Sequence, residues 1–389
     1  MRSLTQRVQN LKSEGAYAVL ARAQAREAKG EKIIHLEIGQ PDFPTPENVS
    51  AAGIQAIVDG KTKYTPPAGM PGFRELIAQF AGRQRGISIN PSGVIVAPGT
   101  KPGLFFPTLA LVEPGDEVIY PDPGFPTYES VIRLTGGIPV PVPLREEENF
   151  SFNLDEFDSR LNQHTKLIIL NSPSNPTGSV IPLHALQHIA DKASQYDCWV
   201  LSDEIYSRLV YDDLAAHSIS EVEGMLDRCI IVDGFSKSYS MTGWRLGYMI
   251  APPEVAQRLE LLITHATGCT ATFTQYAGME ALIGPQDSVH NMVAVYQNRR
   301  DRMLELVNAI PGIHAAKPGG AFYIFPNIKS FGLSSKEVAA RLMDEAGVAV
   351  LAGTDFGTNG EGYIRLVYAV SREEIEQGME KITSWFRSL

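Results

Sequence analysis

The sequence contains few cysteines and no long apolar run. Its three cysteines, Cys198, Cys229 and Cys269, are far apart and show no CxxC or metal-ligand spacing. We therefore expect reduced thiols, no metal site and a cytoplasmic protein. No apolar stretch is long enough to cross a bilayer, and residues 1–7 lack the apolar core of a signal peptide. Export and membrane anchoring are not expected.

Positive charge is also scarce. The 34 lysines and arginines are outnumbered by 44 aspartates and glutamates, which gives a formal net charge of −10. Such a molecule repels nucleic acid and anionic membranes as a whole, so a local cluster of positive groups must hold any anionic ligand. The 389 residues, of which 44% are hydrophobic, are enough for two globular domains.

Short β-branched runs alternate with helical patterns from about residue 94 onward. The runs are residues 94–97, 117–120, 166–170, 198–201 and 229–232. This alternation predicts an α/β fold in which helices cover a mainly parallel sheet.

The pattern changes beyond about residue 285. A long polar helix around residues 296–307 is followed by apolar runs at residues 321–325, 348–351 and 363–367. We therefore predict three parts. They are a large domain of residues 46–284, a smaller α+β domain of residues 285–389, and an N-terminal segment, residues 1–45, that joins the small domain.

Polar residues follow several of the predicted strands. They are Thr100 and Lys101, Asn171 and Asn175, Asp203 and Tyr206, and Ser236 and Lys237. Ligands of such sheets gather beyond the carboxyl ends of the strands. The sequence therefore predicts a binding site at this edge of the sheet.

Lys237 is the most reactive candidate among them. It lies in the string GFSKSYSMTGWRLG, residues 234–247, directly after an apolar run. A lysine can form an imine once its ammonium loses a proton, and burial near another cation favours the neutral amine. Arg245 is such a cation and could also bind a phosphate through two hydrogen bonds. This string resembles the pyridoxal-phosphate attachment signature of class I and II aminotransferases.

The resemblance extends over nearly the whole chain and implies a fold, a cofactor and a reaction. The family has a fold type I large domain with a mainly parallel seven-stranded sheet, and a smaller α+β domain. It implies a homodimeric enzyme that moves an amino group between an L-amino acid and a 2-oxo acid through an imine on Lys237. The subgroup that this sequence resembles includes bacterial aspartate aminotransferases.

The cofactor pyridoxal 5′-phosphate needs a phosphate site and groups around its ring. Gly99, Thr100 and Lys101 follow a strand and open a helix, so free N–H groups there could bind the phosphate, although an ordinary glycine turn has the same pattern. Asp203 could hold the pyridine nitrogen protonated, and the alternative for it is a helix cap. The resemblance implies that Tyr206 and Asn175 bond to the ring oxygen.

Three further positions match the family outside the lysine motif. Gly39 implies a contact with the substrate, and Tyr64 implies a contact with the cofactor phosphate of the neighbouring subunit, although a packed loop aromatic is an equal alternative. Arg365 matches the arginine that binds the α-carboxylate of the substrate. An arginine in an apolar strand is costly unless an anion pairs with it.

The sequence departs from the family at several points. Phe125 stands where many relatives place a tryptophan over the cofactor ring. Gly234 replaces a serine that binds phosphate in some relatives, and Ser236 and Thr100 are the candidates for the missing hydroxyl. Lys101 matches a lysine that lies near an acidic substrate side chain in some bacterial aspartate aminotransferases. Residues 13–17, however, differ from the Ser-Ala-Thr pattern of those enzymes, so aspartate specificity is not predicted.

Two other functions share these motifs. The same constellation could serve β- or γ-elimination and replacement, racemisation, or carbon–carbon bond formation. A regulatory protein could keep the fold without turnover, but we expect no DNA-binding segment before residue 1 and find every catalytic position filled. The amino donor, the acceptor and the pathway cannot be named from the sequence.

Overall fold

The structure, a computed structural model, describes residues 4–9, 11 and 14–389. Its main sheet has seven strands in the order β2-β8-β7-β6-β5-β3-β4. These strands are β2 (Val94–Ala97), β3 (Glu117–Asp122), β4 (Ile138–Pro143), β5 (Thr165–Asn171), β6 (Trp199–Asp203), β7 (Cys229–Gly234) and β8 (Gly247–Ile250). Only β8 runs antiparallel to its neighbours. The prediction of an α/β fold with a mainly parallel seven-stranded sheet is confirmed.

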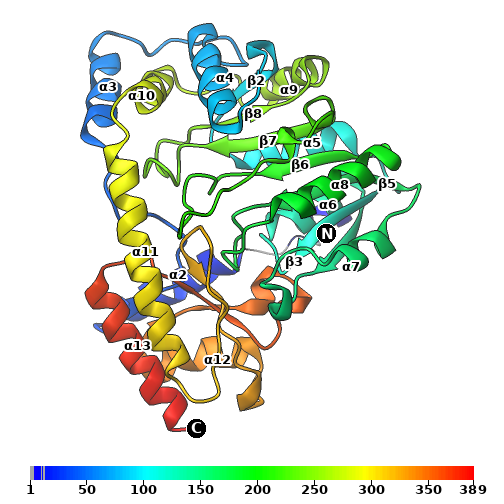
Figure 1. Ribbon diagram of the computed structural model, residues 1–389. Helices are drawn as coiled ribbons and strands as arrows, with labels where there is room; N and C mark the ends of the chain where they lie inside the picture. Colours follow the sequence, from blue (N-terminus) through cyan, green and yellow to red (C-terminus); the bar gives the residue numbers. More distant parts are fainter. Residues whose placement is uncertain (1–3, 10, 12–13) are drawn as a thin grey trace.

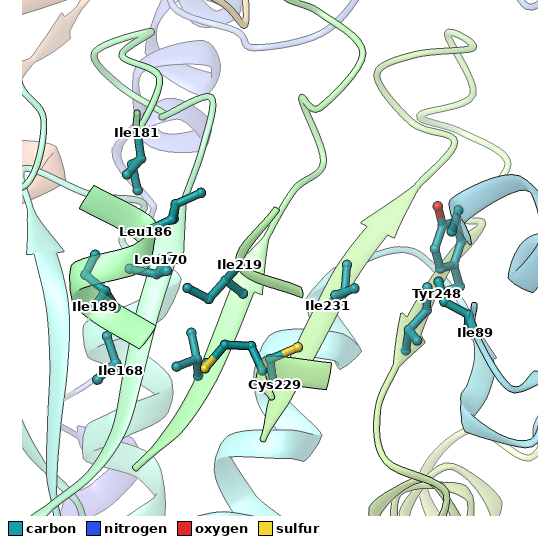
Figure 2. Close-up of a cluster of buried hydrophobic side chains, with 14 of the residues drawn as sticks. Ile89, Ile168, Leu170, Ile181, Leu186, Ile189, Ile219, Cys229, Ile231 and Tyr248 are labelled. Atoms are coloured by element: carbon teal, nitrogen blue, oxygen red, sulfur yellow. The ribbon is translucent and has the colours of Figure 1, made fainter. Parts of the chain in front are cut away.

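Strand residues alternate between two hydrophobic cores, one on each face of the sheet. Leu167 and Ile169 of β5 join the core that includes residues of α5, α6 and α9, whereas Ile168 and Leu170 join the core on the other face. Side chains of α8 pack on this second face, as Figure 2 shows for Leu186 and Ile189. Because successive side chains of a strand point to opposite faces, an apolar run without polar interruption marks a strand that is covered on both sides.

Helices connect the strands and cover the sheet (Figure 1). Those of this part are α3 (Glu47–Val58), α4 (Pro71–Arg85), α5 (Lys101–Leu111), α6 (Thr127–Thr135), α7 (Leu154–Arg160), α8 (Leu183–Gln195), α9 (Pro253–Ala266) and α10 (Thr272–Ile283). The amino-terminal helices are α1 (Gln6–Gln9) and α2 (Gly15–Glu27). No helix in the described part of the chain is long and apolar enough to span a membrane.

A separate core lies in the lower part of the molecule in Figure 1, and the long helix α11 (Asp287–Asn308) contributes side chains to it. Its other elements are α12 (Ser335–Arg341), α13 (Arg372–Arg387) and the short strands β1 (Ile34–His35), β9 (Tyr323–Ile324), β10 (Val348–Ala349), β11 (Leu351–Ala352) and β12 (Ile364–Val367). β1 pairs in parallel with β10, so a segment from the start of the chain packs with elements from its end. The domain boundaries at residues 45/46 and 284/285 stay a prediction.

Candidate active site

A cavity of about 690 Å³ lies at the carboxyl ends of β5, β6 and β7. It brings together most of the predicted site residues. Those that line it are Gly39, Thr100, Lys101, Phe125, Asn175, Asp203, Tyr206, Ser236, Lys237, Arg245 and Arg365. Gly99 lies behind this wall, against Arg245. Tyr64 is 96% exposed and is not part of the cavity.

The Lys237 amine lies at the centre of several positive charges. It follows β7 in a tight turn, and its Nζ donates a hydrogen bond of 2.5 Å to the Gly39 carbonyl. Burial, together with the charges of Arg365 and Arg245, lowers the pKa of Lys237 to about 7. A large share of this amine is therefore neutral near neutral pH, which is the form that attacks a carbonyl carbon.

Asp203 supplies a buried carboxylate at the end of β6. Burial raises the pKa of Asp203 to about 6, although hydrogen bonds from Tyr128 and from the Ile205 N–H oppose this shift. Tyr128 donates its hydroxyl proton to Oδ2 over 2.8 Å. The group is thus ionised above about pH 6 and is ready to pair with a cation in the cavity.

Arg365 is an arginine inside the apolar strand β12, with 3% of its surface exposed. Its Nη1 donates to Oδ1 of Asn175 over 3.1 Å, its Nη2 donates to the Glu37 carbonyl, and its Nε has no partner. Burial lowers the pKa of the guanidinium. A buried cation with an unpaired N–H is stabilised by an anion. A carboxylate could accept a hydrogen bond from this N–H.

Aromatic side chains shape the wall around these charges. The Tyr206 and Tyr323 hydroxyls lie 2.6 Å apart, and the Arg365 guanidinium lies 4.5 Å from the centre of the Tyr323 ring. A Cβ at Gly39 would come within 2.2 Å of the Tyr323 hydroxyl. Glycine at position 39 therefore keeps the backbone close to this cluster.

The start of α5 forms a second positive region with Arg245. Gly99 has a φ of 90°, and a Cβ there would meet Nη2 of Arg245 at 2.1 Å. Arg245 itself has a φ of 52°, which is an uncommon conformation for a non-glycine residue and is often found at functional sites. The guanidinium and the first-turn N–H groups of α5 together suit a phosphate.

Tyr128, Tyr323 and Glu14 are among the cavity residues that sequence reasoning missed. Tyr128 follows Phe125 by three residues on the first turn of α6, and nothing in the sequence pairs it with Asp203. Tyr323 lies within an apolar run that is typical of a hydrophobic core. Glu14 belongs to the segment that departs from the family pattern, and its Oε1 pairs with Nζ of Lys101. Ser13 lies outside the described residues.

The match to known proteins covers most of the chain. The pattern of the family "Aminotransferase class I and II" matches residues 31–382. This chain belongs to that family. An aspartate aminotransferase of Pyrococcus horikoshii is 38% identical over 92% of this chain and 91% of its own length. The aromatic-amino-acid aminotransferase 2 of Thermococcus litoralis is 38% identical over 90% of this chain and 91% of its own length.

A solved structure shares the fold. The aspartate aminotransferase of Thermus thermophilus with maleate has a TM-score of 0.94 at 37% identity and covers 100% of both chains. The chain is therefore an aminotransferase, and the family to which it belongs uses pyridoxal phosphate. The prediction of the enzyme class and of the cofactor is confirmed.

The residues of the cavity fit this cofactor. Lys237 offers a largely neutral amine, and Asp203 offers a buried carboxylate for the ring nitrogen. Arg245, packed against Gly99 at the start of α5, offers positive charge for the phosphate. Phe125, which lines the same cavity, offers an aromatic face for the ring.

Proposed function

We propose that this aminotransferase holds pyridoxal phosphate on Lys237 and transfers an amino group from an L-amino acid to a 2-oxo acid. One observation carries this assignment of roles. The Lys237 amine, the Asp203 carboxylate and the Arg365 guanidinium line the same cavity. These are a nucleophile, a partner for the cofactor ring and an anchor for the substrate.

Lys237 has two tasks in this proposal. When bound, the cofactor supplies an aldehyde carbon for amines and a cationic ring that accepts the electrons released at the substrate Cα. Lys237 Nζ would hold the cofactor before the substrate binds. Once free, the same amine would remove the proton from the substrate Cα and later give it back. A pKa of about 7 suits a group that must both take up and release a proton.

Asp203 keeps the cofactor cationic by ion pairing with the protonated ring nitrogen. Tyr128 orients this carboxylate and supports its charge through the 2.8 Å hydrogen bond. Asn175 and Tyr206 would bond to the ring oxygen. Burial strengthens this ion pair, because the low local dielectric increases the attraction between the carboxylate and the ring nitrogen.

Arg365 binds the substrate α-carboxylate through its fork of N–H donors. Asn175 holds one arm of the guanidinium and the Glu37 carbonyl holds another. The Arg365 side chain is therefore oriented before the substrate binds, and it loses little rotamer entropy on binding. Gly39 lies beside this position and leaves room for the substrate backbone.

Elimination, racemisation and carbon–carbon bond formation are the alternatives within the same cavity. The names of the relatives favour amino-group transfer. The test is a panel of amino acids added to the purified holoenzyme. Transamination predicts that the absorbance of the lysine-bound cofactor decreases while one oxo acid is released per site. A long-wavelength band that persists without oxo acid would support the alternatives.

The same proposal includes a homodimer in which Tyr64 reaches the phosphate of the neighbouring site. Two features support it. Tyr64 is 96% exposed, which is unusual for a tyrosine in a loop, and Arg245 of the phosphate region is exposed as well.

The free thiols at Cys198, Cys229 and Cys269 support the cytoplasmic location expected from the sequence.

A further inference from the structure

The ion pair between Lys101 and Glu14 lies in the wall of the substrate cavity. Lys101 begins α5, and its Nζ contacts Oε1 of Glu14, the residue that precedes α2. Both residues line the cavity that also holds Lys237 and Arg365. Lys101 therefore enters the cavity with its charge already matched by a carboxylate of the same chain.

The position of Glu14 is fixed by contacts on more than one side. The Thr127 hydroxyl, on α6, donates to the same Oε1 over 3.4 Å. The next residue, Gly15, packs so closely on Asp355 that a Cβ would meet the carboxyl carbon at 2.5 Å. The segment that carries Glu14 is thus placed by contacts with α5, α6 and the loop around Asp355.

Apolar side chains share this cavity with the ion pair. Ala16 and Leu20 of α2 line it, as does Leu104 of α5. The Lys101 Nζ lies 5.6 Å from the centre of the Phe125 ring. Apolar surface of this kind stabilises an apolar or aromatic substrate side chain.

We propose that Glu14 determines the substrate specificity by neutralising Lys101, so that the preferred amino donor has an uncharged, mainly apolar side chain. This inference rests on the proposed function, because it assumes that Arg365 binds the α-carboxylate. A donor with a second carboxylate would have to compete with Glu14 for Lys101 and would meet the negative charge of Glu14 at the same place.

The test is Glu14→Gln, which keeps the size of the side chain and removes its charge. Glu14 and Lys101 are both partly exposed, and such an ion pair contributes up to about 1 kcal/mol. We therefore expect kcat/KM for aspartate and glutamate to rise about fivefold. Values for leucine and phenylalanine should change by less than about twofold. The Kd of succinate, an unreactive dicarboxylate, should fall about fivefold while that of butyrate stays the same.

Two matched variants complete the experiment. In the double variant Glu14→Gln with Lys101→Met, the gain for acidic donors and for succinate should disappear, because no free cation is left. Glu129→Gln removes a carboxylate from α6 that pairs with Arg133 outside the cavity. This control should change neither the acidic nor the neutral donors.

Several results would overturn the inference. One is a wild-type enzyme that prefers aspartate or glutamate over leucine and phenylalanine. Another is an unchanged ratio of acidic to neutral donors in Glu14→Gln, or an equal loss for all donors, which would make Glu14 a residue of the fold. A loss confined to lysine as donor would show that Glu14 binds a cationic side chain. Failure of the proposed function is distinct, since wild type would then release no oxo acid from any donor.

Discussion

Tyr128 donates a 2.8 Å hydrogen bond to Oδ2 of Asp203, and both side chains are buried. This contact joins the start of α6 to the carboxyl end of β6. Burial raises the pKa of Asp203, and this side-chain hydrogen bond lowers it. Tyr128 is therefore a positioning residue for the carboxylate that we assign to the cofactor ring.

Removing this hydrogen bond should weaken proton abstraction. In Tyr128→Phe, we expect kcat to fall about tenfold, because a hydrogen bond to a buried charged group contributes about 1.5–3 kcal/mol. Only the Ile205 N–H bond then opposes burial, so the pKa of Asp203 rises above about 6 and the carboxylate is lost at a higher pH. The acidic limb of the kcat/KM profile should move upward. An unchanged profile would show that Tyr128 only fills space.

Asp203→Asn removes the charge and keeps the shape of the side chain. If Asp203 holds the ring nitrogen protonated, the variant should bind the cofactor and lose about 10²–10³-fold in kcat, which is typical for a lost preorganised electrostatic contact. Single-turnover decay of the cofactor absorbance with an amino donor measures this step. A rate near that of wild type would assign Asp203 to capping or folding.

The low pKa of Lys237 should depend on the charge of Arg365. In the apoenzyme, burial and Arg365 are the two largest causes that lower this pKa to about 7. The neutral amine is present above the pKa and is lost as the pH falls through it. Arg365→Met removes the cation, so the pKa should rise and acylation of Lys237 should require a higher pH. Arg365→Lys keeps the charge and is the matched control. Equal pH profiles for all three proteins would contradict this account.

Arg365→Lys also tests the binding of the α-carboxylate. The lysine keeps the charge but gives up the two-pronged contact. Because every amino donor has an α-carboxylate, kcat/KM should fall by a similar factor for acidic, aliphatic and aromatic donors. A loss confined to acidic donors would assign Arg365 to the distal carboxylate instead.

The strands of the main sheet could be predicted where both faces are buried. The runs ending at Leu170 and Val232 lie within strands, and the run ending at Leu201 begins one residue before its strand. The observed strands continue by one or two residues to Asn171, Asp203 and Gly234. β4 was not predicted, because Pro139, Pro141 and Pro143 argue against a strand and are tolerated only because β4 pairs with β3 alone. β8 begins at Gly247, the last residue of the lysine motif, and the sequence analysis did not predict it as a strand.

The candidate site could be predicted where residue type and motif agree, as at Lys237, Asp203, Asn175 and Arg365. Contacts between distant segments could not be predicted. Glu14 meets Lys101 although 87 positions separate them, and Tyr206 meets Tyr323 across 117 positions. Such contacts depend on how the small-domain elements pack against the sheet, which no local pattern encodes.

The shared site of the proposed dimer can be tested by mixing two inactive variants. Tyr64→Ala lacks the tyrosine, and Lys237→Ala lacks the amine. After unfolding and refolding together, half of the dimers should be hybrids. If Tyr64 acts on the neighbouring subunit, each hybrid has one intact site and about a quarter of wild-type activity returns. No recovery would show that Tyr64 acts within its own subunit or not at all.

The attachment point of the cofactor tests the central claim most directly. Borohydride reduction of the holoenzyme fixes the cofactor to the amine that carries it, and peptide mapping by mass spectrometry then locates the modified lysine. We expect the label on Lys237 alone, and no fixed label in Lys237→Ala, which should still bind the cofactor but show almost no turnover. A label on any other lysine of the wild-type enzyme would contradict the account.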